Sequence, residues 1–322
     1  MIKNVTRLDA KNNPNIIVPL ASDEIFHKVF GTKENVSNTE VLISVFLGIP
    51  LEDIKGRVEI KSSDMDNLTV FSKHGEKDIV AWVDINEPLK LNIEMNRFST
   101  SPVTIDRNTF FLADLFSSGL QYGTGYKNLV TTIQINFNPR YVDQINSPII
   151  DKYTLKNTYN YELTNKFILY QINLAELSDI WYNKSKKDVS NIDPLVILFG
   201  ALIWENEKDK FKKIVDEMLI DKDIKDSIEG IVLNMNKDTF VVRNYYDIEE
   251  ARIEEWNAEI EYAKKESYKE GHESGLIEGL KEKEREIILN MYNKNIDIHT
   301  ISDISNLSIK EIEKIINENT NK

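Results

Sequence analysis

Near the N-terminus, apolar positions recur at helical spacing. Residues 22–31 and 38–47 each carry apolar side chains three and four positions apart, which predicts two helices. Ser22 or Asp23 is placed to cap the first helix, and Gly31 is placed to end it. The chain before them, rich in asparagine, is expected to be an extended tail over residues 1–20.

The following segments change to the pattern of strands. Residues 57–61 alternate between apolar and polar, and residues 68–72 are rich in β-formers. Residues 78–85 and 90–96 are two further β-runs that flank the short polar turn 86–88, which contains a proline. Two such runs around a turn predict an antiparallel hairpin.

Helical and strand-like patterns continue to alternate beyond the hairpin. They predict a helix over 106–120, a strand over 129–137, two strands within 153–174 and a helix over 195–219. This alternation is typical of an α/β domain with a mixed sheet flanked by helices, which we place at residues 21–235.

The character of the chain changes near residue 246, where a charged and helical extension begins. Residues 247–286 hold 14 acidic and 7 basic side chains, so this one segment contributes −7 of the total charge of −13. Residues 295–319 resemble a small helix–turn–helix, in which Ser308 and Glu311 form a capping box. We therefore expect an acidic helical extension over 246–322, suited to packing or to self-association as a homo-oligomer.

Composition excludes several classes of site. The chain has no cysteine, which rules out disulfides, thiolate zinc sites and cysteine nucleophiles. Its four histidines are scattered, so any metal ligands should be oxygens, which favours Mg²⁺ or Mn²⁺. No phosphate-binding GxxxxGK[ST] loop is present, and the spaced glycines 271, 275 and 279 do not form GxGxxG, so no nucleotide cofactor is expected.

The length of the apolar runs bears on location. None approaches the ~18 residues of a membrane span, and the N-terminus is too polar for a signal-peptide core. We expect an intracellular, cytoplasmic protein that does not span a membrane.

The predicted hairpin carries the most informative polar residues. Asp78 opens its first strand, while Glu94 and Asn96 lie near the end of the second and share one face. Folding the hairpin would bring Asp78 close to Glu94, and two carboxylates plus water are ligands that Mg²⁺ prefers. A polar group such as Asn96 would orient the attacking water. Two alternatives stay open: Asp84 rivals Asp78, and the acids are simply solvated on the sheet.

These segments together resemble a known family. SDEIFHKVFG (22–31) is similar to the first-helix signature of the transposase-like, recombination-promoting branch of the PD-(D/E)XK nucleases, and residues 39–54 are similar to its second helix. KDIVAWVD…LNIEMN (77–96) resembles the core of that branch. Residues 106–137 resemble its following block, and the glycine-spaced tail resembles its C-terminal part.

The resemblance implies a restriction-endonuclease-like fold and assigns roles to residues. Asp78 and Glu94 would hold the metal, and Asp23 would support it through water. Asn96 occupies the position where broader PD-(D/E)XK enzymes carry lysine and this branch usually carries glutamine. Arg107 matches the arginine of the family.

Two basic residues are candidate DNA contacts. Lys28 is either a phosphate contact or part of a solvated helix face. For Arg107, DNA contact and a structural ion pair are both open.

The resemblance further implies a Mg²⁺- or Mn²⁺-dependent DNA endonuclease, nucleoid-associated in use. It would be linked to recombination, mobile elements or phage defence, and would hydrolyse DNA in line to leave a 3′-hydroxyl. The alternative is a weakened nuclease-fold protein that binds DNA or a partner protein without cutting.

Overall fold

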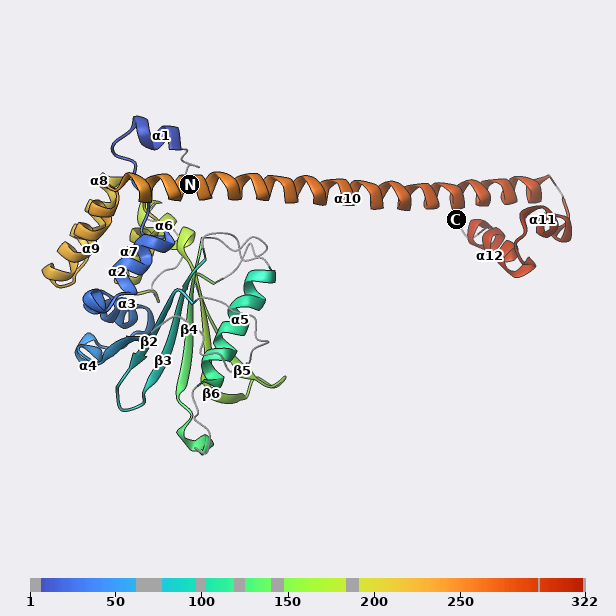
Figure 1. Cartoon of the computed structure of the whole chain (residues 1–322). Coiled ribbons are helices and arrows are strands. Elements are labelled where there is room, and N and C mark those ends of the chain that lie inside the picture. The colour runs from blue at the N-terminus through green and yellow to red at the C-terminus, as the bar shows by residue number, and fades with distance from the viewer. Residues whose placement is uncertain are drawn as a thin grey trace, which may run out of the picture. The chain divides into compact units, whose positions relative to one another are not determined.

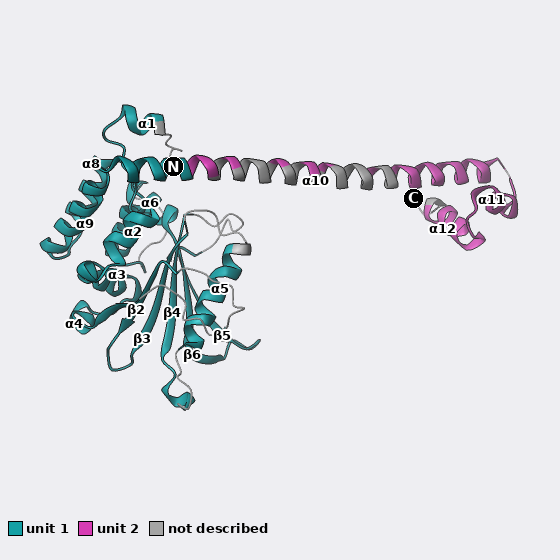
Figure 2. Ribbon diagram, in the orientation of Figure 1, with its two compact units in different colours: residues 1–248 teal, residues 249–322 magenta. Residues whose placement is uncertain are grey.

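The computed structural model describes residues 7–61, 77–96, 102–118, 125–139, 148–183, 191–294 and 296–320. The chain divides into two compact units, residues 1–248 and 249–322 (Figure 2). The strand predicted over residues 68–72 lies outside the described residues.

A six-stranded mixed sheet forms the centre of the first unit (Figure 1). Its strands are β1 (Val58–Lys61), β2 (Ile79–Val83), β3 (Leu89–Met95), β4 (Thr131–Asn138), β5 (Ile150–Lys156) and β6 (Glu162–Asn173), in the order β1-β2-β3-β4-β6-β5. The β3–β4 and β4–β6 pairs are parallel, and the other pairs are antiparallel. The predicted α/β class with a mixed sheet flanked by helices is confirmed.

One face of this sheet is apolar because alternate residues of the central strands are Ile, Leu, Ala or Phe. On this face the ring of Phe137 in β4 meets Phe26 of α2 (Asp23–Phe30) and Phe46 of α3 (Val36–Leu47), with ring centroids 5.9 Å and 4.8 Å away. Phe46 also contacts Phe199 of α7 (Pro194–Trp204). The predicted helices over 22–31 and 38–47 are thus confirmed, and their apolar stripes cover this face.

The opposite face of the sheet is polar and nevertheless buried. Its alternate positions are amides, a lysine, a threonine and a carboxylic acid: Lys90, Asn92, Glu94 and Asn96 from β3 and its end, Thr132, Gln134, Asn136 and Asn138 from β4, and Gln171 and Asn173 from β6. The crossover helix α5 (Pro102–Ser117) contacts β3, β4 and β6 on this side (Figure 1). This covered polar face holds the residues that the sequence singles out.

Two expectations for the first unit need correction. The segment 195–219 is two helices, α7 and α8 (Lys208–Glu217), rather than one. The helix is interrupted where the chain between α7 and α8 forms backbone hydrogen bonds with the chain near the N-terminus. Ile17 N donates to Asn206 O, and Lys208 N donates to Asn15 O.

The expected tail, residues 1–20, is also not simply extended. It contains the short helix α1 (Arg7–Asn12), and Ile17, Val18 and Leu20 are buried in the core. Asn236 binds both the N–H and the carbonyl of Val18.

The remaining helices of the first unit complete its surface. They are α4 (Leu51–Ile54), α6 (Leu174–Asn183) and α9 (Lys222–Met235), with 3₁₀ turns at Lys33–Asn35 and Tyr126–Asn128. The chain turns from β6 into α6 without a loop, so the second of the two predicted strands ends directly in a helix.

The described part of the second unit consists of helices and the short connections between them. It contains most of α10 (Thr239–Asn293), followed by α11 (Ile298–Ser305) and α12 (Ile309–Thr320). The predicted capping box is present, since Ser308 N donates to Glu311 Oε2 and Glu311 N donates to Ser308 Oγ. A small core joins the three helices through Ile288, Ile301, Ile312 and Ile316. No described helix of the chain is long and apolar enough to cross a membrane.

Candidate active site

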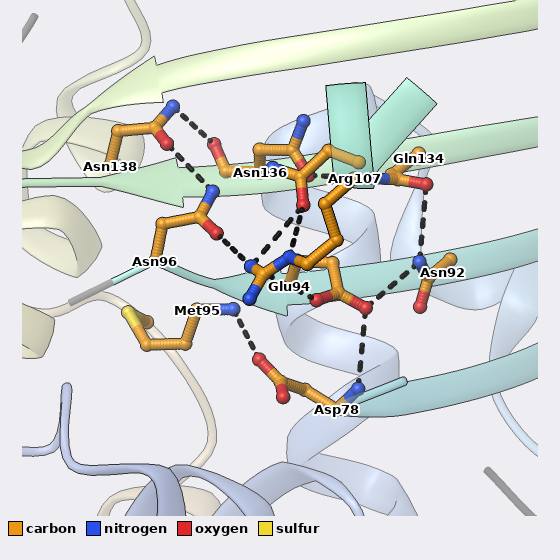
Figure 3. A network of polar contacts seen from close by, with 10 residues as sticks. Asp78, Asn92, Glu94, Met95, Asn96, Arg107, Gln134, Asn136 and Asn138 are labelled. Atoms are coloured by element: carbon orange, nitrogen blue, oxygen red, sulfur yellow. Dashed lines mark hydrogen bonds and ion pairs between the residues drawn. The ribbon is translucent and has the colours of Figure 1, made fainter. Parts of the chain in front are cut away.

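The β2–β3 hairpin places two acidic side chains next to each other (Figure 3). Ile79 pairs with Ile93, so Asp78, just before β2, lies beside Glu94 near the end of β3. Asp78 N donates to Glu94 Oε1 over 3.3 Å, and Asp78 Oδ2 accepts from Met95 N over 2.6 Å. The short turn between the strands sets this register, which orients both carboxyl groups toward one end of the hairpin.

Glu94 is costly to ionise at this position. Its side chain is 3% exposed. Burial raises the pKa of Glu94 to about 8, and the neighbouring charge of Asp78 contributes in the same direction. Hydrogen bonds from Asn92 and from Asp78 N, together with the charge of Arg107, offset part of that increase. The pair therefore carries an electrostatic repulsion that a bound cation would relieve.

Asp84 lies at the other end of the same strand. It follows β2, it is exposed, and its N–H donates to Arg57 O. Because Val83 pairs with Leu89 at the turn end of the hairpin, Asp84 cannot take the place of Asp78 beside Glu94. Of the two acids that the sequence left open, Asp78 is thus the one that lies beside Glu94.

Asn96 follows β3 directly and is held at both ends of its amide. Asn96 Nδ2 donates to Asn138 Oδ1 over 2.8 Å, and Asn96 Oδ1 accepts from Arg107 Nη2 over 2.8 Å. Its backbone N–H donates to Phe137 O. With only 4% of the residue exposed, Asn96 is a buried link between β4 and α5.

Arg107 reaches the acid pair from α5. Its Nη2 lies 3.9 Å from Glu94 Oε2, and half of its side chain is exposed. The guanidinium also donates to Asn108 Oδ1 and lies 5.7 Å from the ring centroid of Phe111. Asp78, Glu94, Asn96 and Arg107 therefore lie together, as Figure 3 shows.

A row of buried amides extends from this cluster across the sheet (Figure 3). Asn92 Nδ2 donates to both Glu94 Oε1 and Gln134 Oε1, and Gln134 Nε2 donates to Asn136 Oδ1. Asn138 Nδ2 continues the row to the side chain of Gln171. These residues were not predicted from the sequence, although the alternation in TTIQINFN (131–138), with a polar side chain at every second position, is the signal that marks them.

Some amide atoms of this face have no hydrogen-bond partner among the described residues. They are Asn92 Oδ1 and Asn136 Nδ2 on the sheet, and Asn108 Nδ2 on the covering helix α5. A buried amide atom without a hydrogen-bond partner lowers the free energy of unfolding by ~1–3 kcal/mol, so this polar face stabilises the fold less than an apolar face would.

The other predicted site residues lie on α2. Asp23 is exposed in the first turn of the helix, and Lys28 is exposed near its end. In the described part of the chain, no three or more His, Asp or Glu side chains form a group that could hold a metal, so Asp23 is not gathered with Asp78 and Glu94. The roles of Asp23 and Lys28 stay predictions.

The chemistry of the acid pair fits a hard divalent cation. Two carboxylates of different elements, one pushed toward its protonated form by the other, are what one Mg²⁺ or Mn²⁺ would bind with water as its remaining ligands. Asp78 and Glu94 are the residues that would hold it.

Comparison with known proteins identifies the family. No curated protein and no solved structure matches the chain. A family described as "PD-(D/E)XK nuclease family transposase" matches residues 20–263, which include the whole sheet and the acid pair. The chain belongs to the PD-(D/E)XK nuclease family transposases.

Proposed function

We propose that this protein is a divalent-metal-dependent endonuclease that hydrolyses phosphodiester bonds in DNA. The observation that carries the proposal is the contact between Asp78 and Glu94, where the fold holds two acids together at a cost in ionisation. Family membership supports the reaction class and DNA as the substrate.

The roles of the two acids follow from how they are held. Asp78 is oriented by Met95 N, and Glu94 by Asp78 N and Asn92 Nδ2, so both carboxyl groups are positioned before any ligand arrives. A bound Mg²⁺ or Mn²⁺ would polarise the phosphodiester and lower the pKa of a water molecule. The protein contributes a fixed ligand pair, in which Glu94 is buried and Asp78 is half-buried.

The biological setting is part of the same proposal. The family description supports a link to transposition, which we extend to recombination, mobile elements or phage defence in a bacterial cytoplasm, at the nucleoid. Self-association through the C-terminal helices would supply the two active sites that a double-strand cut requires. The exposed Lys28 and the half-exposed Arg107 are the proposed DNA contacts.

A second candidate function is favoured by one specific observation. Where broader PD-(D/E)XK enzymes carry lysine and this branch usually carries glutamine, this chain has Asn96, whose amide is buried and bonded at both ends. A nuclease-fold protein whose residue at this position cannot reach the phosphate would bind DNA or a partner protein without cutting DNA.

Plasmid cleavage tests the proposal. Supercoiled plasmid is incubated with the full-length protein in Mg²⁺, in Mn²⁺ and in EDTA. We expect metal-dependent nicking or linearisation that falls to the EDTA level in Asp78→Asn and in Glu94→Gln. Asp84→Asn is the matched control, because it removes an exposed acid from the other end of the same hairpin and should cut like the parent.

Two results would contradict the proposal. Cleavage that survives both substitutions would place the active site elsewhere. Absence of cleavage, with salt-dependent DNA binding retained, would favour the non-cutting function.

A further inference from the structure

At the position where broader PD-(D/E)XK enzymes carry lysine and this branch usually carries glutamine, Asn96 supplies no positive charge. Asn96 Nδ2 is bonded to Asn138 across the sheet, and its Oδ1 is occupied by Arg107. Because the residue is buried, a water or phosphate at the acid pair would not reach its amide N–H groups. β3 therefore supplies a carboxylate through Glu94 but no cation beside it.

α5 supplies the missing cation from outside the hairpin. Arg107 Nη2 lies within 4 Å of Glu94 Oε2 and hydrogen-bonds Asn96, so the guanidinium occupies the space next to the acid pair. Half of the side chain is exposed, so Arg107 borders the solvent beside the acid pair. Unlike Asn96, it combines a permanent charge with exposure to solvent.

The guanidinium is also held in place before any substrate arrives. Its Nη2 donates to Asn96 Oδ1, both Nε and Nη2 contact Asn108 Oδ1, and the ring of Phe111 lies below. No hydrogen bond of Nη1 to another described residue accompanies these contacts. A planar fork with one edge fixed and another edge available suits recognition of a phosphate group.

We propose that Arg107 is a catalytic residue that binds the scissile phosphate and supplies the positive charge that lysine supplies in broader PD-(D/E)XK enzymes, with Asn96 as its positioning residue. This inference rests on the proposed nuclease function. The Asn96–Asn138 hydrogen bond fixes the amide, and the amide in turn fixes the guanidinium.

The chemical role follows from the charge of the phosphate. In hydrolysis, the oxygen of water forms a new bond to phosphorus and releases a proton to solvent, the P–O3′ bond breaks, and the 3′ oxygen leaves with a proton that solvent supplies. Negative charge grows on the oxygens around phosphorus during this step. Arg107 keeps its own proton, because a guanidinium stays charged in proteins, and stabilises that charge through its N–H groups.

Single-turnover cleavage of a labelled DNA duplex in Mg²⁺, at saturating protein, tests this role. We expect Arg107→Ala to lower the cleavage rate by ~10²–10³-fold, as for removal of one donor to a transition-state charge. Arg107→Lys should retain an intermediate rate. Arg57→Ala is the control, because Arg57 is exposed next to Asp84, at the opposite end of the hairpin, and its loss should leave the rate unchanged.

A relocation variant separates catalysis from a structural role. In Arg107→Ala/Asn96→Lys, the cation returns on β3, and we expect at least tenfold recovery over Arg107→Ala alone. A lysine at position 96 would not rebuild the contact with α5, so recovery cannot come from restored packing. Urea unfolding of each variant shows which of them remain folded.

DNA affinity provides the readout besides activity. In the Asp78→Asn background, fluorescence anisotropy with the same duplex should show less than about tenfold weakening on Arg107→Ala, as for one lost phosphate contact. An Arg107→Ala rate equal to that of the parent would overturn the inference. So would a fall in rate matched by an equal fall in affinity, or a relocation variant that is folded and recovers nothing. A parent that cuts in neither Mg²⁺ nor Mn²⁺ overturns the nuclease proposal itself, and this inference with it.

Discussion

Lys77 Nζ lies 2.7 Å from Asp114 Oδ2, and this ion pair joins the residue before Asp78 to helix α5. The lysine side chain is 4% exposed and the aspartate 19%, so the pair is largely removed from water. Arg107 lies two turns earlier on the same helix and contacts Asn96 and Glu94 at the end of β3. α5 is therefore fixed to both strands of the hairpin, at the positions that carry the acid pair.

The first prediction concerns this ion pair. Asp114→Ala should lower the free energy of unfolding by ~3–5 kcal/mol, because it leaves the buried charge of Lys77 without a partner. Urea denaturation of the parent and the variant measures the change. Lys77→Met/Asp114→Leu should recover most of the lost stability, because apolar residues often replace a buried pair without cost. If the single and the double variant are equally unstable, the charge of Lys77 is not the cause.

The second prediction is a pH dependence of stability that originates in Glu94. Its pKa in the folded state, about 8, exceeds the ordinary value of 4.5, so the folded protein binds a proton that the unfolded chain releases. The protonated acid stabilises the fold fully below pH ~4.5, and this contribution is lost as pH rises to about 8. In EDTA, the stability of Glu94→Gln relative to the parent should thus increase over that range, by at most ~1.4 kcal/mol per pH unit.

Denaturation at several pH values tests this dependence. Glu59→Gln is the matched control, because it removes an exposed acid from β1, where Glu59 pairs with Trp82 and not with the acid pair. If the free energies of unfolding of the parent and of Glu94→Gln differ by the same amount at every pH between 5 and 8, Glu94 is not the titrating group.

The hairpin was predictable because its determinants are local. Alternating apolar residues define β2 and β3, and a short turn with Pro88 sets their register, so Asp78 and Glu94 were expected to meet. The choice between Asp78 and Asp84 needed the register itself, which sequence gives only to within a few residues.

Contacts between segments far apart in the sequence could not be predicted from local patterns. The position of Arg107 depends on how the crossover helix α5 lies on β3, and no periodicity within 102–117 specifies which strand residue it meets. The break between α7 and α8 depends on pairing with residues some 190 positions earlier. Tertiary contacts decide both features, and local patterns do not record them.

The third prediction concerns the row of amides. Asn138→Leu should destabilise the protein by ~2–5 kcal/mol, because it removes the partners of Asn96 Nδ2 and Gln171 Oε1 and leaves both atoms buried. Urea denaturation measures the loss. Asn138→Asp is the informative companion, since it keeps an acceptor for Asn96 but places a charge in the row. A neutral outcome for Asn138→Leu would mean that water enters the row and satisfies these groups.

The last prediction is metal binding by the acid pair, measured without any substrate. Thermal unfolding of the parent should shift to higher temperature in Mn²⁺, and the linked gain in stability is ~2.7 kcal/mol when the free metal is 100 times its dissociation constant. Asp78→Asn and Glu94→Gln should each abolish most of the shift, because the remaining acid alone binds a divalent cation weakly. Asp84→Asn should keep it, since this exposed acid lies at the turn end of the hairpin. A shift of equal size in all four proteins would show that the metal binds elsewhere, which would remove the main support for assigning Asp78 and Glu94 as its ligands.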